Sequence, residues 1–218
     1  MPDVDYALAR NNMVDGQIRT ADVTDPALIF ALRSVPREGF VPAALRSLAY
    51  MGEGVEAAPG RQLMDPRVFA KLVIAADVRA TDKVLDVGGG TGYSAAILAR
   101  LAADVVALEE PLLAPIAREH LAATGVQGVE VVAGPLNQGW AGAAPYDVIF
   151  LNGAIAVQPE ALLAQLAPGG RLVGIVTDKA AGKAHIFVKS VAGVSSRIAF
   201  DASVAPLPGF AAAPHFAF

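Results

Sequence analysis

An acid and four glycines in the middle of the chain have types and a spacing that suggest ligand binding. They are Asp86, Gly88, Gly89, Gly90 and Gly92. An apolar run precedes them and a second apolar run follows, so they are expected to form a turn between a strand and a helix. Glycine lets a ligand approach the backbone closely, because no side chain stands in the way.

Two phosphate-binding motifs do not match this turn. A P-loop requires a lysine directly after its last glycine, and none follows here. The dinucleotide fingerprint G-x-G-x-x-G, started at Gly88, places Tyr93 where the third glycine is needed for close helix–strand packing. Asp86 would also repel a pyrophosphate bound at the start of the following helix. The acid instead suits a ligand that carries an ammonium group.

A second acid, Glu109, ends the next apolar run, "VVALE". A carboxylate in this place can accept hydrogen bonds from two ribose hydroxyls. NAD enzymes use an acid there as well, so Glu109 alone does not discriminate between ligands. Glycine-rich turns also occur without a ligand, and an acid after a strand is often only solvated. It is Asp86 together with Tyr93 that favours a ligand without phosphate.

The elements that must position these residues alternate between strand and helix. Short, almost wholly apolar runs predict strands at 83–87, 104–108, 129–133, 146–151 and 171–176. Helices are predicted between them at 93–102, 112–124 and 159–167. This alternation predicts an α/β fold, doubly wound, with a mostly parallel Rossmann-like sheet. Two further strands, 184–191 and 196–204, are expected to pair antiparallel, because no helix-length segment separates them.

The first part of the chain has a different pattern. Residues 5–50 are expected to be helical with turns, and the Gly- and Pro-rich stretch 51–66 is expected to be loop. A helix over 67–78 leads into the first strand. We therefore divide the chain into a helical N-terminal extension with a substrate and cofactor loop, residues 1–65, and a Rossmann-like domain, residues 66–218, within one structural unit.

Composition excludes several classes of function. The net charge is −4, so nothing favours a nucleic-acid partner, and the absence of cysteine excludes disulfides and thiolate chemistry. The three histidines lack the spacing of metal ligands, so no metal is expected. No apolar run is long enough to cross a membrane, and the cytoplasm is the expected location. The apolar tail 204–218 is broken by prolines and is expected to pack on the domain or to form a homo-oligomer.

Several segments resemble one family in order and spacing. They are "QIR" (17–19), "VPREGFVP" (35–42), "AY" (49–50), "LDVGGGTGYSAAILA" (85–99), "APYDVIF" (144–150) and "LAPGGRLV" (166–173). The chain resembles the protein-L-isoaspartate O-methyltransferases, which are class I S-adenosylmethionine-dependent methyltransferases. The resemblance implies S-adenosyl-L-methionine as cofactor, with Asp86 and the glycines at its methionine end and Glu109 at its ribose.

The resemblance also implies a repair reaction on proteins. The family methylates the α-carboxylate of isoaspartyl residues, the ester closes to a succinimide, and hydrolysis partly restores aspartate. An acceptor carboxylate is already ionised at neutral pH, so no side-chain base is expected. The enzyme has to supply alignment and a dry site.

The chain departs from the family in its acceptor loop. Members carry a motif close to G-Q-T-I-S-Q-P, whereas this chain has "GRQLMDP" (60–66). Gln62 replaces the threonine and Met64 the serine, so both hydroxyls are lost, and Leu63 lies between them. Asp65 adds a negative charge near the expected acceptor carboxylate, or it caps the helix that begins at Pro66.

A second departure follows the third predicted strand. The family has G-D-G there, and its acid binds the adenine amino group. This chain has Gly134, Pro135 and Leu136, so only apolar contacts and neighbouring backbone are left for an adenine. The first hypothesis is therefore a divergent isoaspartyl methyltransferase. The alternatives are methylation of another, small or uncharged acceptor on the same scaffold, or a catalytically degenerate interaction protein.

Overall fold

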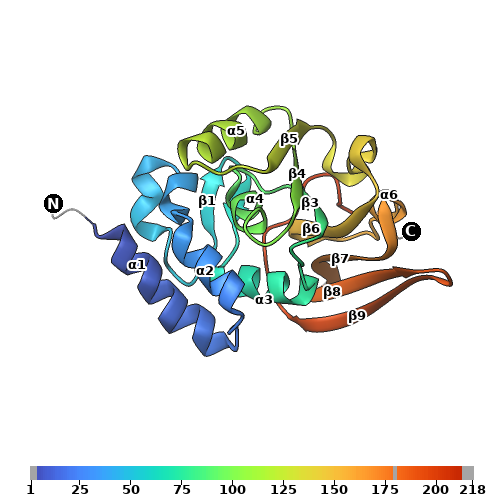
Figure 1. Cartoon of the computed structure of the whole chain (residues 1–218), viewed down its shortest axis with the longest axis horizontal. Coiled ribbons are helices and arrows are strands. Elements are labelled where there is room, and N and C mark those ends of the chain that lie inside the picture. The colour runs from blue at the N-terminus through green and yellow to red at the C-terminus, as the bar shows by residue number, and fades with distance from the viewer. Residues whose placement is uncertain (1–3, 179–180, 213–218) are drawn as a thin grey trace, which may run out of the picture.

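A seven-stranded sheet forms the centre of the computed structural model, which describes residues 4–178 and 181–212 (Figure 1). Within this part of the chain the strand order is β5-β4-β3-β6-β7-β8-β9. The strands are β3 (Lys83–Val87), β4 (Asp104–Glu109), β5 (Val129–Ala133), β6 (Tyr146–Ile155), β7 (Leu166–Asp178), β8 (Ala181–Ser190) and β9 (Gly193–Asp201). Strands β3 to β7 pair in parallel, whereas β8 and β9 are antiparallel.

The strand order reverses between β3 and β6. Chain order runs from β3 through β4 to β5 on one side of β3, and from β6 onward on the other side. The connections after β3 and β6 therefore leave the sheet in opposite directions, and open α/β sheets bind ligands beyond the carboxyl ends of two such strands, a place here called the crevice. This is the place where the predicted ligand turn lies.

The strand sequences are apolar on both sides, and the two sides build separate cores. Val84 of β3 and Val148 of β6 belong to one buried cluster, whereas their neighbours Leu85 and Ile149 belong to the other. The first cluster also contains residues of the N-terminal helices. Because successive side chains of a strand point to opposite faces, a continuous apolar run is what a sheet covered on both faces requires.

The two faces are covered by different kinds of segment. The helices are α1 (Tyr6–Met13), α2 (Pro26–Ser34), α3 (Pro66–Ala76), α4 (Tyr93–Leu98), α5 (Ala114–Ala123) and α6 (Glu160–Ala164). The first core takes its helical residues from α1 to α5, whereas the described residues that the second core takes from outside the strands come from α6, short 3₁₀ turns and the C-terminal segment. Figure 1 shows α1 and α2 on the side of the molecule opposite the β8–β9 hairpin.

The sequence predicted most of these elements and missed two strands. Strands β3 and β5 have the predicted bounds, and the antiparallel pairing of the last two strands is confirmed. The stretch 51–66 was wrongly predicted to be only loop, because it contains an antiparallel hairpin of β1 (Val55–Ala58) and β2 (Arg61–Leu63). Tertiary contacts override its glycine-rich composition, since three of the four side chains of β1 are buried.

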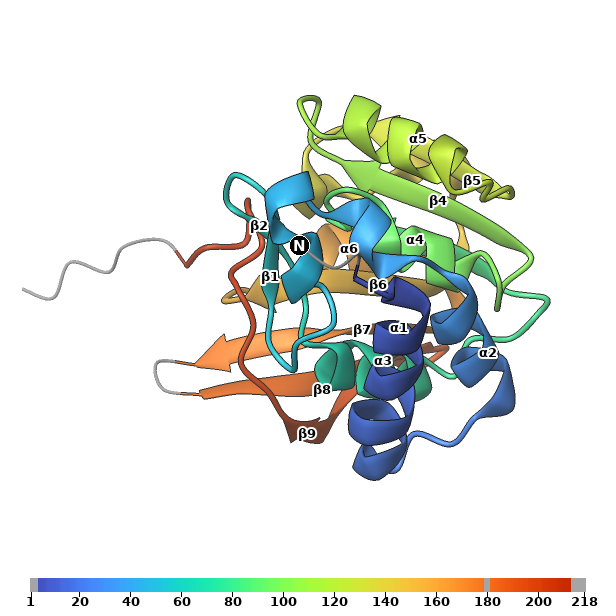
Figure 2. The ribbon, with the colours of Figure 1, turned by 90° about the vertical axis from the view of Figure 1, so that its left-hand side faces the viewer.

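Residues 204–210, here called the C-terminal strap, lie along the end of β6. The Ala154 amide donates to the Ala205 carbonyl (2.9 Å), and the Leu207 amide donates to the Ala154 carbonyl (2.7 Å). Leu207 and Phe210 are buried in the second core. Figure 2 shows this segment running beside the β1–β2 hairpin. The strap therefore packs on its own domain, and the rest of the tail, 213–218, lies outside the described residues.

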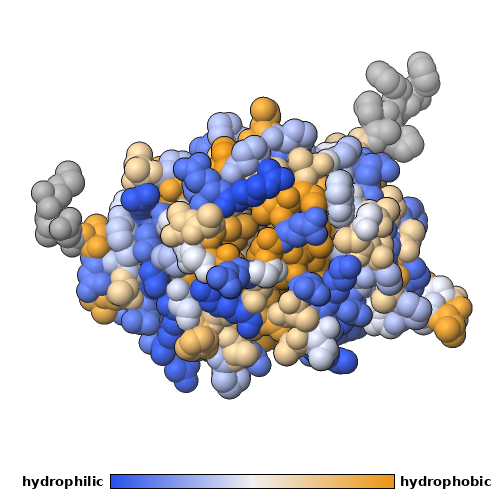
Figure 3. Space-filling model, turned by 45° about the horizontal axis from the view of Figure 1, so that its top comes forward, coloured by the Kyte–Doolittle hydropathy of each residue, from blue (hydrophilic) through white to orange (hydrophobic). Residues whose placement is uncertain are grey.

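The face drawn in Figure 3 carries both hydrophilic and apolar residues. Figure 3 shows apolar residues gathered in a hollow near the middle of one face, with hydrophilic residues around them. None of the described helices is long and apolar enough to cross a membrane.

Candidate functional site

Asp86 ends up buried at the carboxyl end of β3, with 1% of its surface exposed. Its Oδ2 accepts a hydrogen bond from the Ser94 hydroxyl (2.6 Å), and its Oδ1 accepts one from the Asn152 amide (2.6 Å). Burial raises the pKa of Asp86 to about 7, although both hydrogen bonds act in the opposite direction. Each carboxylate oxygen can accept a further hydrogen bond, so the acid is able to bind an ammonium group.

The glycine turn adopts a backbone that L side chains rarely adopt. Gly88, Gly90 and Gly92 have φ values of 71°, 63° and 101°. Gly89 is required for a different reason, because a Cβ there would lie 2.5 Å from the Ser94 hydroxyl and 2.7 Å from the Asp86 carboxylate. The turn thus keeps the predicted residues together beside the acid.

Glu109 lies at the end of β4, next to the glycine turn, and 2% of its surface is exposed. Its Oε2 accepts from the Gly90 amide (2.6 Å), and its Oε1 accepts from the Glu110 amide (2.8 Å). The Arg61 guanidinium of the β1–β2 hairpin also binds Oε1, and it reaches Glu110 Oε2 at 3.1 Å. Burial raises the pKa of Glu109, and the charge of Arg61 opposes this.

Pro135 and Leu136 follow β5 and differ in exposure. Pro135 is exposed, whereas Leu136 is buried in the second core. A Cβ placed on Gly88 would lie 3.3 Å from Leu136 Cδ1, so Leu136 faces the glycine turn from the β5 side. The structure therefore brings Leu136, the glycine turn and Glu109 to one crevice.

The acceptor loop, residues 60–66, comprises β2 and the turn that leads into α3. Gln62 is exposed, and Leu63 and Met64 are buried. Asp65 caps α3, because its Oδ1 accepts from the Arg67 amide (2.7 Å) and its carboxylate pairs with the Arg67 guanidinium. The hydrogen bond to the Arg67 amide confirms the capping interpretation of Asp65. The Arg67 guanidinium also balances the charge of Asp65.

Arg37, from the segment "VPREGFVP", holds the acceptor loop from inside. It is 1% exposed, and it donates to the carbonyl oxygens of Ala49 (2.7 Å) and Met64 (2.6 Å). Its guanidinium lies 4.8 Å from the centre of the Tyr93 ring. One buried cation therefore connects the N-terminal extension, the acceptor loop and the helix that follows the glycine turn.

A cleft of about 350 Å³ opens beside the acceptor loop. It is lined by Gly54, Gln62, Met64, Asp65, Asn152, Ser203, Val204 and Ala205. The cleft thus lies between the β1–β2 hairpin and the segment that leads into the strap, and Asn152 connects it with Asp86. Among the described residues that line it, Asp65 carries the charge and neither lysine nor arginine contributes.

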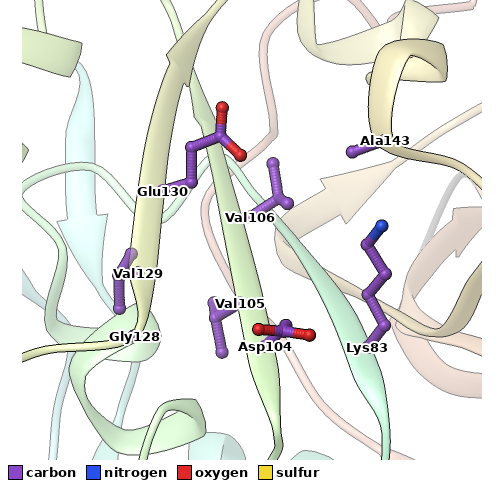
Figure 4. A pocket seen from close by; sticks show the side chains of 8 residues that line it. All are labelled: Lys83, Asp104, Val105, Val106, Gly128, Val129, Glu130 and Ala143. Carbon is purple, nitrogen blue, oxygen red and sulfur yellow. The ribbon is translucent and has the colours of Figure 1, made fainter.

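Another cavity, of about 470 Å³, lies away from these residues. Its lining includes the first residues of β3, β4 and β5, namely Lys83, Asp104 and Val129 (Figure 4). Ligands of open α/β sheets bind at the carboxyl ends of strands. This cavity is therefore not part of the candidate site.

Sequence reasoning missed several residues that complete the site. Ser94 and Asn152 hold Asp86, Thr91 donates to the Phe40 carbonyl (2.6 Å), and Arg61 pairs with Glu109. Ser94 and Thr91 adjoin the glycine motif, so their proximity in sequence is a usable signal. Asn152 and Arg61 come from distant segments and give no such signal.

Comparison with known sequences gives a consistent result. The profile of the family described as Protein-L-isoaspartate(D-aspartate) O-methyltransferase matches residues 8–205. A protein-L-isoaspartate O-methyltransferase of Methanoculleus marisnigri is 42% identical over 168 residues, which cover 77% of this chain and 76% of the relative. One of Methylorubrum extorquens is 42% identical over 173 residues, which cover 79% of this chain and 75% of the relative.

Solved structures share the fold. One protein-L-isoaspartate O-methyltransferase has a TM-score of 0.82 at 24% identity, and the match covers 92% of this chain and 66% of that one. A Plasmodium falciparum protein, solved in complex with S-adenosyl-L-homocysteine, has a TM-score of 0.77 at 16% identity, covering 94% and 99%. At these identities the likeness establishes the fold alone.

Proposed function

Because the chain belongs to the protein-L-isoaspartate O-methyltransferase family, we propose that it methylates isoaspartyl residues of proteins. Members of the family are S-adenosyl-L-methionine-dependent methyltransferases. The observation that carries the proposal is the position of Asp86. The acid lies at the carboxyl end of β3, beside the glycine turn and at the point where the strand order reverses. We also propose that the chain works in the cytoplasm.

The residues of the crevice fit this cofactor in type and position. Asp86 would bind the ammonium group of the methionine end, and Glu109 would accept from the ribose hydroxyls. Leu136 would contact the adenine, and the exposed Pro135 would border the edge of the adenine ring. The cofactor fits only if two side chains move aside. Arg61 now occupies an oxygen of Glu109, and Leu207 lies against Gly88.

The reaction needs little from protein side chains. When bound, the cofactor supplies a methyl group on a positively charged sulfur. An isoaspartyl carboxylate is ionised at neutral pH, so no residue has to remove a proton from it. The chain has to align the acceptor oxygen with the methyl group and to exclude water. Arg37 contributes by fixing the Met64 carbonyl, and thereby the loop that borders the acceptor cleft.

The lining of the cleft favours a second candidate function. No lysine or arginine is among the described lining residues, and Asp65 is already paired with Arg67, so the lining offers no cation to an isoaspartyl carboxylate. The two hydroxyls of the family motif, which could donate hydrogen bonds to a carboxylate, are absent as well. The second candidate is therefore a methyltransferase of the same scaffold that acts on a neutral or cationic acceptor.

Methyl transfer from labelled S-adenosyl-L-methionine to an isoaspartyl peptide tests the first candidate. The matched control is the same peptide with a normal aspartyl linkage. Transfer to the isoaspartyl peptide alone supports the proposal. Cofactor binding without transfer to either peptide would contradict it and favour the second candidate.

A further inference from the structure

Asn152 of β6 lies between the acceptor cleft and the glycine turn. It lines the acceptor cleft together with Gln62 and Met64. The same three residues also line a small inner cavity, whose other walls include Gly89 and Ser94. The inner cavity therefore lies between the glycine turn and the acceptor cleft, and Asn152 borders both spaces.

The side-chain amide of Asn152 is held at its nitrogen end. Nδ2 donates to Asp86 Oδ1 (2.6 Å) and to the Val87 carbonyl (3.1 Å). An amide nitrogen carries two hydrogens, so both donors are used. Because a carbonyl oxygen only accepts, the contact with Val87 identifies the nitrogen end of this amide.

The oxygen of the same amide is available to a ligand. None of the described residues donates to Asn152 Oδ1, and this oxygen is not one of their buried polar atoms that lack a partner. Asn152 as a whole is half-buried, and the spaces that it lines are the acceptor cleft and the inner cavity. Its oxygen therefore presents two lone pairs to these spaces.

An amide oxygen accepts hydrogen bonds and cannot donate, so it binds an N–H or O–H group and repels a carboxylate. In an isoaspartyl residue, the α-carboxylate and a backbone N–H are attached to the same carbon atom. In a normal aspartyl residue, the side-chain carboxylate is one carbon farther from the N–H. An acceptor atom in the cleft that binds this N–H therefore places the carboxylates of the two linkages differently.

We propose that Asn152 is a specificity-determining residue, whose Oδ1 accepts a hydrogen bond from the N–H beside the α-carboxylate of an isoaspartyl substrate. This role rests on the proposed function, which takes an isoaspartyl residue as the methyl acceptor. Recognition through the N–H needs no cation, in agreement with a cleft whose described lining contains neither lysine nor arginine. The same amide donates to Asp86, so it positions the acceptor relative to the acid proposed to bind the cofactor.

Two peptides that differ in one atom group test this hydrogen bond. One carries an isoaspartyl residue, and in the other an ester oxygen replaces the N–H beside the α-carboxylate. Methyl transfer is measured with labelled S-adenosyl-L-methionine. We expect kcat/KM of the native chain to be roughly tenfold lower for the ester peptide, the worth of one hydrogen bond. Asn152→Ala should methylate the two peptides with the same kcat/KM.

The ratio between the two peptides separates recognition from structure. Asn152→Ala also removes the donor shared by Asp86 and Val87, so its cofactor affinity is expected to fall, but this loss is common to both peptides and cancels in the ratio. Asn152→Ser keeps a hydroxyl donor and should also lose the discrimination, which keeps the test decisive if Asn152→Ala does not fold. Asn12→Ala, on the exposed part of α1, is the matched control and should keep the native ratio.

The possible results distinguish this role from the proposed function. Equal methylation of both peptides by the native chain, or the native ratio in both Asn152 variants, would overturn the role of Asn152 and leave the isoaspartyl activity in place. A native chain that binds S-adenosyl-L-homocysteine but methylates neither peptide would overturn both. A ratio that is lost in the Asn152 variants and kept in Asn12→Ala supports the role.

Discussion

Arg61 and Glu109 form a buried ion pair that ties the β1–β2 hairpin to the carboxyl end of β4. The two residues are 48 positions apart, and their side chains are 6% and 3% exposed. In a dry environment such a pair is costly to break, because the remaining charge loses its partner but does not regain water.

A double-mutant cycle measures this pair. We expect Arg61→Gln to lower the free energy of unfolding by about 3 kcal/mol, since it leaves Glu109 buried without its cation. The double variant Arg61→Gln/Glu109→Gln should recover part of that loss. Urea unfolding gives both values. The control is Arg79→Gln, which removes an exposed pair with Asp77 and should change stability by less than about 1 kcal/mol. Additive losses in the cycle would show that the pair is not coupled.

The second prediction concerns the pH dependence of stability. Burial raises the pKa of Asp86 to about 7, whereas in the unfolded chain it titrates near 4. Between these values the folded chain holds a proton that the unfolded chain has lost, so this residue's contribution to stability decreases as pH rises. Asp86→Asn abolishes the effect. We expect the unfolding free energy of the variant, relative to the native chain, to increase by on the order of 4 kcal/mol between about pH 4 and about pH 8.

The same variant should bind the cofactor less well. Asparagine has no charge for the ammonium group, so the affinity for S-adenosyl-L-homocysteine should fall by roughly 10- to 100-fold, the loss of a hydrogen bond to a charged group. Titration at one pH, beside the unfolding series, shows the two effects together. A relative stability that does not vary with pH would show that burial does not raise the pKa of Asp86, and an unchanged affinity would show that Asp86 is not the ligand acid.

The third prediction concerns the acceptor loop. Gln62→Thr combined with Met64→Ser restores the two family hydroxyls, which can donate to an acceptor carboxylate. Native activity on isoaspartyl peptides should be weak, and the double variant should raise kcat/KM by roughly tenfold, the worth of one added hydrogen bond. Gln62→Val combined with Met64→Ala is the control, because valine and alanine are close in volume to threonine and serine but lack their hydroxyls. Strong native activity, or no gain despite cofactor binding, would contradict this account of the loop.

The fourth prediction concerns Arg37. Arg37→Met keeps the length of the side chain but leaves the Ala49 and Met64 carbonyls buried without a donor. We expect a loss of about 2–4 kcal/mol in the free energy of unfolding. Because the acceptor loop is then less fixed, KM for the acceptor should rise more than the Kd for S-adenosyl-L-homocysteine. Arg37→Lys, which keeps the charge, should give an intermediate loss. Equal changes in both constants would assign Arg37 to general stability only.

Local sequence patterns were enough to locate the strands of the central sheet. Strands β3 and β5 have the predicted bounds because each is a short apolar run between turn residues. The α4 helix ends at Leu98, before the predicted 102, because the amides of Arg100 and Leu101 donate to the carbonyls three residues earlier and form turns before β4. Helix ends are set by such neighbours, and apolar spacing does not reveal them.

The crevice is formed by contacts between distant segments, and no local sequence pattern records such contacts. The sequence pointed to Asp86 and Glu109, but it did not show that Arg61 and Leu207 meet beside Gly88. Arg61 lies in a stretch that was predicted to be loop, and the strap was expected only to pack somewhere on the domain or on a partner. Pairings between distant segments become visible only when the sheet brings them together.

The first core has a consequence for how this chain can have changed over time. It joins residues of the N-terminal extension with residues of the sheet, and Thr91 in the glycine turn donates to the Phe40 carbonyl. A recombination event that exchanged residues 1–65 for those of a distant methyltransferase would have to match both the packing and this hydrogen bond. We therefore expect that the extension can be exchanged only together with the sheet on which it packs.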